Sequence, residues 1–327
     1  MINPQKTEQD TLLETLDLAR LAPSIHNSQP WRWRVEPRAV RLYADLRRWL
    51  PVTDQDGRDL MLSCGAALHH LRVALAASGI AARVRRLADP DERDLLAVVE
   101  VDPHALAEPG LGSVEPLYRR RTDRRRFNPW PVPQEFLNEL VQRAAEQGAV
   151  LRAVSDLPTR RKLVAAIAQT ARAQAATPGY PEETAAWSGR TDTPDGIPTA
   201  NTPRADQEGA AVPMRDFGDG TLEQPTDTED GTMLLALGTS SDDHLSQLRA
   251  GEAMSAVLLR ATELELATCP LSQPLEVDDT RHTLRDVVLH GTLSPQLILR
   301  IGWPPAGVPA IPPTPRRPLT EIVEVLD

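Results

Sequence analysis

Hydrophobic residues recur at three- and four-residue spacing in several stretches of the chain, which is the pattern of amphipathic helices. The strongest stretch is residues 57–78, where leucines and alanines form a continuous face and Gly79 follows at the position of a helix C-cap. A second long apolar helix is expected at residues 244–266. Shorter helices are expected at residues 11–21, 134–147 and 158–175.

Compact apolar runs between these helices predict strands. In chain order they are Trp31–Glu36, Val40–Ala44, Leu95–Val101, Thr232–Leu237 and Leu297–Ile301. Because helices and strands are mixed along the chain, the pattern predicts an α+β fold. A length of 327 residues suits two domains better than one.

The two long helices resemble each other in sequence. The run that begins at Gly65 can be laid on the run that begins at Gly251, with apolar residues falling on apolar residues. Apolar helices also resemble each other by chance, so this similarity is a weak signal. It predicts an internal duplication with two related halves, residues 1–115 and 116–327.

Residues 177–231 differ in composition from the rest of the chain. They hold twelve acidic residues and three arginines, which account for nearly all of the formal net charge of −10. Seven prolines and seven glycines in the same stretch do not favour a regular core. The stretch also contains Tyr180, Trp187, Met214 and Phe217, for which a linker has little use. We expect an insertion that acts as a lid, and a disordered insertion is the alternative.

Composition and charge argue against several classes of protein. Bulk acidity and only 12 aromatic residues argue against a nucleic-acid binder. Cys64 and Cys269 stand far apart without clustered histidines, which argues against a disulfide scaffold and a metal site. No uninterrupted apolar run approaches the roughly 18 residues of a membrane helix. The chain start has no signal pattern, so we expect a cytoplasmic protein without a membrane partner.

Residues 22–31 are the first of three polar segments suited to a small ligand. They read Ala-Pro-Ser-Ile-His-Asn-Ser-Gln-Pro-Trp and lie between an expected helix and an expected strand. Four side chains there both donate and accept hydrogen bonds, which suits a planar heterocycle with carbonyls and ring nitrogens. A polar turn with ordinary caps is the alternative interpretation.

The other two segments are basic. Residues 119–126 hold six arginines among eight residues, and guanidinium groups bind phosphate through paired hydrogen bonds. In an acidic chain, so short a run favours one phosphate monoester over a polyanion. Arg316 and Arg317 form a second basic pair, for which a solvated tail is the alternative. Between these segments, a turn at residues 268–273 would leave backbone N–H groups available to a ligand ring.

Taken together, these segments resemble the flavin-dependent nitroreductase family. Its members carry an RRSxRxF segment for the FMN phosphate, an APSxxNxQPW segment beside the isoalloxazine ring, a turn near flavin N5 and a C-terminal basic pair. Residues 22–31 are similar to the second of these, residues 120–124 to the first and residues 269–273 to the third. With the long insertion, the pattern is similar to the Acg-type branch, whose members are expected to cover the flavin with an internal lid.

The resemblance implies a nitroreductase-like FMN-binding fold in which two fused halves form a pseudo-dimer with one complete site. The RRS-like segment opens the second half here, instead of preceding the APS segment, so each half would supply complementary parts. No metal site is implied, and both a monomer and a homodimer remain open. The implied FMN-binding residues are Pro23, Ser24, Asn27, Arg120, Arg121, Thr122, Arg124, Arg316 and Arg317, with Pro270, Leu271 and Ser272 in the N5 region.

The activity implied by the resemblance is transfer of a hydride from NAD(P)H, through flavin N5, to a nitro compound or a quinone. The family's N5 turn often carries Glu beside Gly, so here a backbone N–H of Leu271 or Ser272 would serve N5. The rival hypothesis is a non-catalytic protein that sequesters or stores FMN beneath the lid. An acidic lid would repel the phosphates of NAD(P)H, which supports the rival.

Overall fold

The computed structural model of the chain describes residues 8–102, 105, 111, 113–204, 211–218, 220–225 and 229–326. The first part of the chain forms helices α1 (Glu8–Ala19) and α2 (Arg58–Ala77), strands β1 (Trp31–Glu36), β2 (Ala39–Ala44), β3 (Ala81–Arg86) and β4 (Leu95–Asp102), and the 3-10 turns η1 (Ile25–Asn27) and η2 (Leu46–Arg48).

The rest of the chain forms a second set of helices and strands. The helices are α3 (Glu115–Arg119), α4 (Gln134–Glu146), α5 (Leu157–Ala175), α6 (Tyr180–Ala186), α7 (His244–Glu263), α8 (Asp278–Val287) and α9 (Leu319–Ile322). The strands are β5 (Val150–Ala153), β6 (Met233–Thr239), β7 (Ala267–Leu271), β8 (Ser294–Gly302) and β9 (Val323–Val325), and the 3-10 turns are η3 (Thr199–Asn201) and η4 (Gln273–Leu275).

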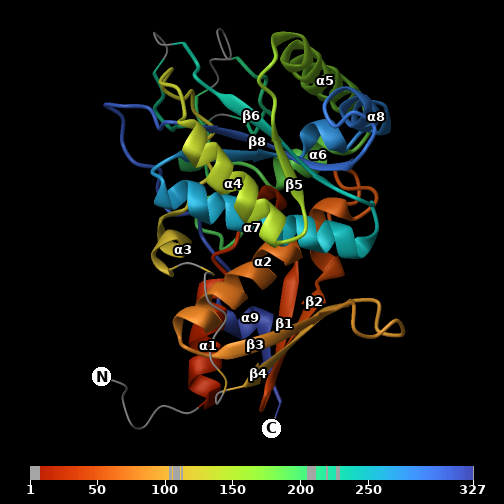
Figure 1. Cartoon of the computed structure of the whole chain (residues 1–327), viewed down its shortest axis with the longest axis vertical. Helices are drawn as coiled ribbons and strands as arrows, with labels where there is room; N and C mark the ends of the chain where they lie inside the picture. The colour runs from red at the N-terminus through yellow and green to blue at the C-terminus, as the bar shows by residue number, and fades with distance from the viewer. Residues whose placement is uncertain are drawn as a thin grey trace.

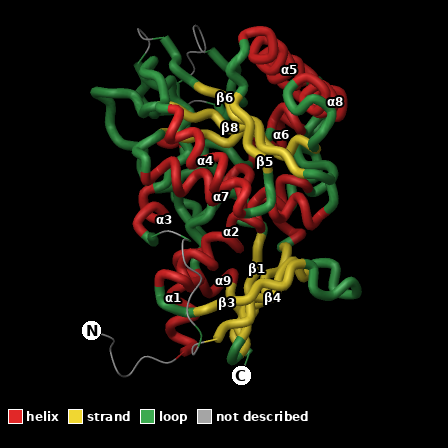
Figure 2. Tube along the Cα trace, in the orientation of Figure 1, coloured by secondary structure: helices red, strands yellow, loops and turns green. Residues whose placement is uncertain are grey.

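The strands form two separate sheets, one in each half of the molecule (Figures 1 and 2). The first has the order β3-β4-β2-β1-β9 and the second the order β5-β6-β8-β7. Read from its other edge, the second sheet has the order β7-β8-β6-β5. When helix α2 is matched with helix α7, strands β2, β3 and β4 therefore correspond to strands β6, β7 and β8. All the corresponding pairs are antiparallel. A duplication requires such a shared topology, and duplication stays a prediction.

The end of the chain returns to the first sheet. Strand β9 pairs in parallel with β1, with Trp33 opposite Val323 and Val35 opposite Val325. Strand β9 consequently lies in the same half of the molecule as helix α1 (Figure 1). The segment that carries Arg316 and Arg317 therefore crosses from the second sheet to the first.

Helices α2 and α7 pack against each other between the two sheets (Figure 1). Gly65 and Gly251, the residues matched in sequence, are where the helices approach most tightly. A Cβ on Gly65 would lie 2.1 Å from Leu248 O, and a Cβ on Gly251 would lie 2.1 Å from Leu62 O, so neither position has room for a side chain. By length and hydropathy α2 would suit a membrane, yet it is mostly buried inside the protein, as a core helix is.

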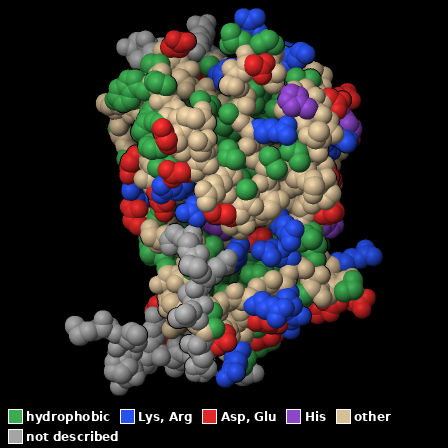
Figure 3. Space-filling view, viewed as in Figure 1, with side chains coloured by type: hydrophobic (Ala, Val, Ile, Leu, Met, Phe, Trp, Pro, Cys, Tyr) green, Lys and Arg blue, Asp and Glu red, His purple; other side chains and the backbone are tan. Residues whose placement is uncertain are grey.

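Side-chain alternation explains how the sheets are covered, because successive residues of a strand face opposite sides. In β6, Leu235 and Leu237 join the core that includes α2 and α7, whereas Leu234 and Ala236 join the cluster around α5 and α8. The second sheet is therefore covered on both faces. The first sheet buries one face and exposes arginines on the other (β1 reads buried, exposed, buried from Trp31). On the face seen in Figure 3, basic and acidic side chains lie beside one another over this half.

The predicted α+β class is confirmed, and every predicted helix and strand is present within a few residues of its expected bounds. The prediction of a turn at residues 268–273 is wrong for its first residues, because residues 267–271 form strand β7 and pair with β8. Strands β3, β5 and β9 were not expected from the pattern. Residues 205–210, 219 and 226–228 of the insertion lie outside the described residues.

Candidate functional site

A central cavity lies where η1, the start of α2, β7 and the insertion meet. It holds about 740 Å³ of space free of protein atoms, part of which is open to solvent. The structure brings together seven of the residues predicted for the site. They are Pro23, Ser24, Thr122, Arg124, Pro270, Leu271 and Ser272.

The turn before β1 is backbone-strained. His26, Asn27 and Gln29 have φ values of 47°, 54° and 51°, in the left-handed region that non-glycine residues rarely occupy. Ser24 Oγ accepts a hydrogen bond from the Gln29 amide at 2.9 Å, and Ser63 Oγ accepts one from the Ile25 amide at 3.1 Å. These two hydroxyls hold the turn in its strained shape, and strain of this kind is concentrated at functional sites.

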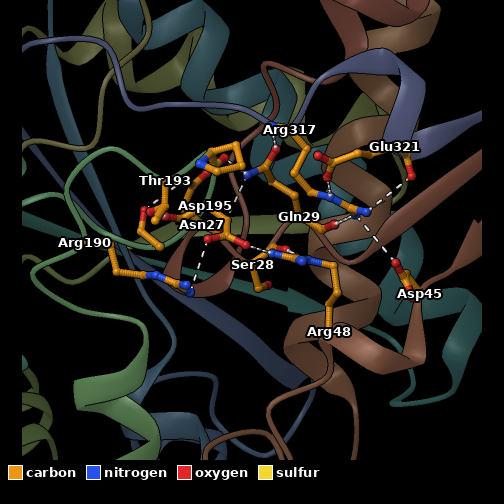
Figure 4. Close-up of polar contacts among 12 residues, drawn as sticks. Asn27, Ser28, Gln29, Asp45, Arg48, Arg190, Thr193, Asp195, Arg317 and Glu321 are labelled. Carbon is orange, nitrogen blue, oxygen red and sulfur yellow. Dashed lines mark hydrogen bonds and ion pairs between the residues drawn. The ribbon is translucent and has the colours of Figure 1, made fainter.

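Asn27 and Gln29 bind the insertion instead of lining the central cavity (Figure 4). Asn27 Nδ2 donates to Gly196 O at 3.0 Å and to Pro315 O at 3.1 Å. Gln29 Nε2 donates to Pro194 O at 2.8 Å. The polar turn therefore fastens both the insertion and the C-terminal segment, which its composition alone did not reveal.

Charge and aromatic contacts reinforce this attachment. Asp195 of the insertion forms ion pairs with Arg48 and, at 3.2 Å, with Arg190 (Figure 4). The guanidinium groups of Arg48 and Arg190 lie 5.2 and 5.4 Å from the ring centre of Trp187. Trp187 and the buried Tyr180 therefore pack on the protein, as the expectation of a packed insertion requires.

Four arginines form what we call the arginine cluster: Arg120, Arg121, Arg124 and Arg316. Within the described part of the chain, none of them has a carboxylate within 4 Å. Arg120 is buried, and its Nε and Nη1 atoms lack hydrogen-bond partners there, as does Arg121 Nε. Arg316 donates to the carbonyls of Arg20, Leu21 and Ala22 at the end of α1. Burial and neighbouring guanidinium groups lower the pKa of Arg120 to about 10 and of Arg316 to about 9.

Arg317 is placed differently from its neighbour. Its side chain pairs with Glu321 at 3.3 Å and Asp45 at 3.6 Å, and its amide donates to Gln29 Oε1 at 2.8 Å (Figure 4). Its charge is therefore compensated within the protein. The predicted basic pair is divided, with Arg316 in the arginine cluster and Arg317 in the structural network of the turn.

His70 is a buried residue in α2 that belongs to none of the motifs from which the site was predicted. Its Nδ1 bonds Ala66 O at 3.0 Å and Ser255 Oγ at 2.9 Å, so this nitrogen carries the proton. Its Nε2 is buried and has no partner among the described residues. Burial, then the charge of Arg120, lowers its pKa, and Arg316 contributes further, so His70 lies within reach of the cluster.

Residues 214–217 of the insertion, which we call the strip, form one wall of the central cavity. Arg215 pairs with Glu276 and donates from Nη1 to His26 Nε2 at 2.7 Å. The Phe217 ring meets the His26 ring edge-on at 5.4 Å and lies 4.9 Å from the Arg124 guanidinium. Burial and the nearby arginines lower the pKa of His26 well below its usual range, so its ring is neutral.

Comparison with known proteins identifies the family to which the chain belongs. The family model described as "Nitroreductase family" matches residues 117–303. Rv3131 of Mycobacterium tuberculosis, provisionally named an NAD(P)H nitroreductase, is 43% identical over 326 residues, covering 99% of this chain and 94% of its own. The chain belongs to the nitroreductase family. These are oxidoreductases, and the resemblance inferred from the motifs is confirmed.

A second relative within the nitroreductase family supports the predicted branch. The acg protein of M. tuberculosis, also provisionally named an NAD(P)H nitroreductase, is 34% identical over 322 residues and covers 97% of this chain and 96% of its own. The FMN-dependent nitroreductase NfnB from Mycobacterium smegmatis, solved with NADPH, is 16% identical over 63% of this chain and 94% of that chain, with a TM-score of 0.40. So low a score carries no argument, and the assignment rests on the sequence relatives.

The nitroreductase match begins just before the arginine run and ends just after β8, so it contains Arg120, Arg121, Arg124 and β7. The turn at residues 22–31 and Arg316 lie outside it, but the whole-length relatives span them. Among the residues that the structure describes, no group of three or more His, Cys, Asp or Glu side chains is placed to hold a metal ion.

Proposed function

We propose that this nitroreductase-family chain binds FMN and transfers electrons from NAD(P)H to a nitro compound or a quinone. The observation that carries the proposal is a cluster of arginines without carboxylate partners, one of which, Arg124, lines the central cavity. The names of the relatives from M. tuberculosis point to the same NAD(P)H-dependent chemistry.

The residues present fit FMN. A buried cation without a counter-ion is costly, and a phosphate dianion supplies the missing charge and the acceptors that Arg120 and Arg121 lack. Arg120, Arg121 and Arg316 would hold the phosphate, and the unpartnered Nε2 of His70 lies within electrostatic reach of them. Thr122 and Arg124 lie in the cavity wall and would meet the ring system with Pro23 and Ser24.

When bound, FMN supplies reversible two-electron chemistry at N5. The chain's own part is to orient the ring, to exclude water and to supply donors at its edge. Ser272 follows the last residue of β7, so its N–H lies outside the strand ladder and is the better placed of the two predicted N5 donors. The Ser272 hydroxyl is directed elsewhere, since it donates to Glu276 at 2.7 Å.

The position of the strip supports the proposal that the insertion is a lid that must move. Met214, Arg215 and Phe217 line the central cavity and two neighbouring cavities, so they form a thin wall between three spaces. With the strip in place, an electron donor or acceptor cannot stack on a ring in the central cavity. Withdrawal of the strip would break the Arg215–Glu276 pair and open the site.

The same observation favours a second candidate function, a non-catalytic FMN-sequestering protein. If the contacts of Arg215 and Phe217 never release, the chain would hold FMN and keep reductants away. The acidic insertion would add repulsion of NAD(P)H phosphates. The two functions predict the same bound cofactor and differ only in whether the strip opens.

An anaerobic absorption experiment on the purified full-length protein separates them. The reductase predicts a flavin spectrum that bleaches within seconds of adding NADPH or NADH. A spectrum that bleaches only with dithionite would support sequestration. Colourless protein that takes up no added FMN would contradict both.

The shared topology of the two sheets supports the proposal that one chain is a fused pseudo-dimer, with halves divided near residue 115. Each half then contributes to one site, because the cavity is lined by residues of both. One FMN per chain is the consequence. A cytoplasmic location and the choice between monomer and homodimer stay predictions.

A further inference from the structure

Asp59 is a buried carboxyl group in the wall of the central cavity, and it was not among the predicted site residues. It lies in the first turn of α2 and is 4% exposed. No hydrogen bond to its carboxyl oxygens is found among the described residues. Its neighbour Asp54 differs, since that carboxylate accepts the amides of Asp59 and Leu60 at 2.9 Å each and so caps the helix.

The charged groups around Asp59 come from every element that packs near it. Asp54 precedes α2, Arg58 lies on α2, Glu276 follows η4, and Arg215 belongs to the strip. The neutral His26 lines the same cavity from η1. Burial, then the charge of Asp54, raises the pKa of Asp59 well above its usual range, and Glu276 adds to this. Arg58 and Arg215 oppose the shift, but each is already paired, with Asp242 and Glu276.

The position of Asp59 relative to the strip gives it access to an acceptor. Arg215 bonds His26 and Glu276 directly, and its charge also acts on Asp59. Asp59 and His26 line the central cavity together with Arg215, so both face the space that the strip bounds. An acceptor that replaces the strip above the ring would come to lie among them, with Asp59 carrying a proton and His26 carrying its proton on Nδ1.

We propose that Asp59 donates the proton that accompanies hydride transfer to a nitro group, an inference that rests on the proposed reductase function. Bound FMN, once reduced, would supply the hydride, and the Asp59 carboxyl would supply one proton. One N–O bond breaks, the nitro compound becomes a nitroso compound, and the released oxygen leaves as water. Asp59 is left as a carboxylate that solvent reprotonates once the strip is open.

The proposal is tested by measuring the two half-reactions separately in stopped-flow experiments on the full-length holoprotein. Asp59→Asn keeps the size of the side chain but removes the acid. Asp56→Asn is the matched control, because Asp56 is a nearby carboxylate that pairs with Arg281 near the surface. Flavin reduction by NADPH should change less than about twofold in either variant. Oxidation of the reduced protein by nitrobenzene should slow about 100-fold in Asp59→Asn alone.

The pH profile gives a readout that a merely structural role would not move. In the native protein, oxidation by nitrobenzene should slow as pH rises through the pKa of Asp59, since the protonated form is active. The profile should be flat in Asp59→Asn and should return in Asp59→Glu. Equal oxidation rates in the native protein and Asp59→Asn, or a flat native profile, would overturn the proposal even if one variant folds poorly.

Preparing the reduced protein with dithionite keeps this test apart from the proposed function. If NADPH fails to reduce the native protein, the reductase proposal fails. The dithionite-reduced protein still reports whether nitrobenzene is reduced with help from Asp59. A fast, Asp59-dependent oxidation would then support the proton donor, and an Asp59-independent one would refute it.

Discussion

Two sets of arginines lie inside this molecule, and they differ in what compensates their charge. Those of one set face carboxylates, and those of the other face only carbonyls, rings and one another. The difference separates residues that hold the fold together from residues that await an anion. The paired arginines include Arg58 with Asp242, Arg125 with Asp123, Arg300 with Asp230 and Arg317 with Asp45, and the unpaired ones are the arginine cluster, Arg120, Arg121, Arg124 and Arg316.

The lowered pKa values of Arg120 and Arg316 reflect the free-energy cost of burying arginines that have no carboxylate partner. A carboxylate beside each of these arginines would have removed that cost, and the chain has more acidic than basic residues from which to supply one. The absence of carboxylates around the cluster, within the described residues, therefore favours an external anion. Binding of FMN would also stabilise the folded protein, by about 2.7 kcal/mol at a free FMN concentration of 100 times Kd.

The largest effect is expected when a paired arginine is removed. Arg300→Met would leave the fully buried Asp230 without its counter-charge, and Arg300 also donates to the Arg125 carbonyl at 3.1 Å. We expect the free energy of unfolding to fall by about 3–5 kcal/mol in urea denaturation. A loss under about 1 kcal/mol would erase the distinction between the two sets.

Removing an unpaired arginine should instead affect the cofactor. Arg120→Met should weaken FMN binding about 10- to 100-fold, the value of one charged hydrogen-bonding group, without lowering the stability of the FMN-free protein. Titration calorimetry and urea denaturation measure the two quantities.

Arg119→Met is the matched control for Arg120→Met. Arg119 is adjacent in sequence but exposed, and it pairs with Glu115 and Glu265 on the surface. Its replacement should leave FMN affinity unchanged. Equal losses of FMN affinity in both variants would mean that the arginine run attracts the phosphate only through its bulk charge.

A smaller effect is expected from pH. Before FMN binds, the pKa of Arg316 is lowered to about 9 and that of Arg120 to about 10, so the cluster loses charge as pH rises through this range. The bound phosphate favours the charged forms, so FMN affinity should fall about tenfold between pH 8 and pH 10. Riboflavin, which lacks the phosphate, serves as the control and should show no such fall.

The smallest effect is expected at Asn27, which the motif placed beside the flavin. Its amide already serves the carbonyls of Gly196 and Pro315. Asn27→Ala should change FMN affinity less than about threefold, while the insertion becomes more accessible to limited proteolysis through loss of about 1 kcal/mol of hydrogen bonding. A large loss of FMN affinity with an unchanged proteolysis pattern would mean that Asn27 contacts FMN directly.

The helices and several strands could be predicted because their signals are local. Residues 58–77 and 244–263 carry a helical period, whereas the close contact of Gly65 with Gly251 was not predicted from their match in sequence. Strand β7 was taken for a turn because its pairing with β8 joins residues that lie apart along the chain. Strand β9 is likewise short and depends on a partner near the other end of the sequence.

The candidate site was predictable in part for the same reason. The motifs identified Ser24, Thr122 and Arg124, which line the cavity, but no sequence feature separates Arg316 from Arg317. Their different roles arise from Asp45, which only the fold brings close. Asp59 and His70 were missed because they belong to none of the motifs, and the sequence carries no signal of an unpartnered atom.

The most direct test of the account is a titration of the FMN-free protein with FMN and with riboflavin, repeated on an Arg120→Met/Arg316→Met variant. We predict one FMN per chain and an FMN affinity at least about 100-fold above that for riboflavin, since several guanidinium groups meet the phosphate. In the variant, the two affinities should become nearly equal while riboflavin binding is retained. An FMN preference that survives both substitutions, or two FMN molecules per chain, would contradict the account.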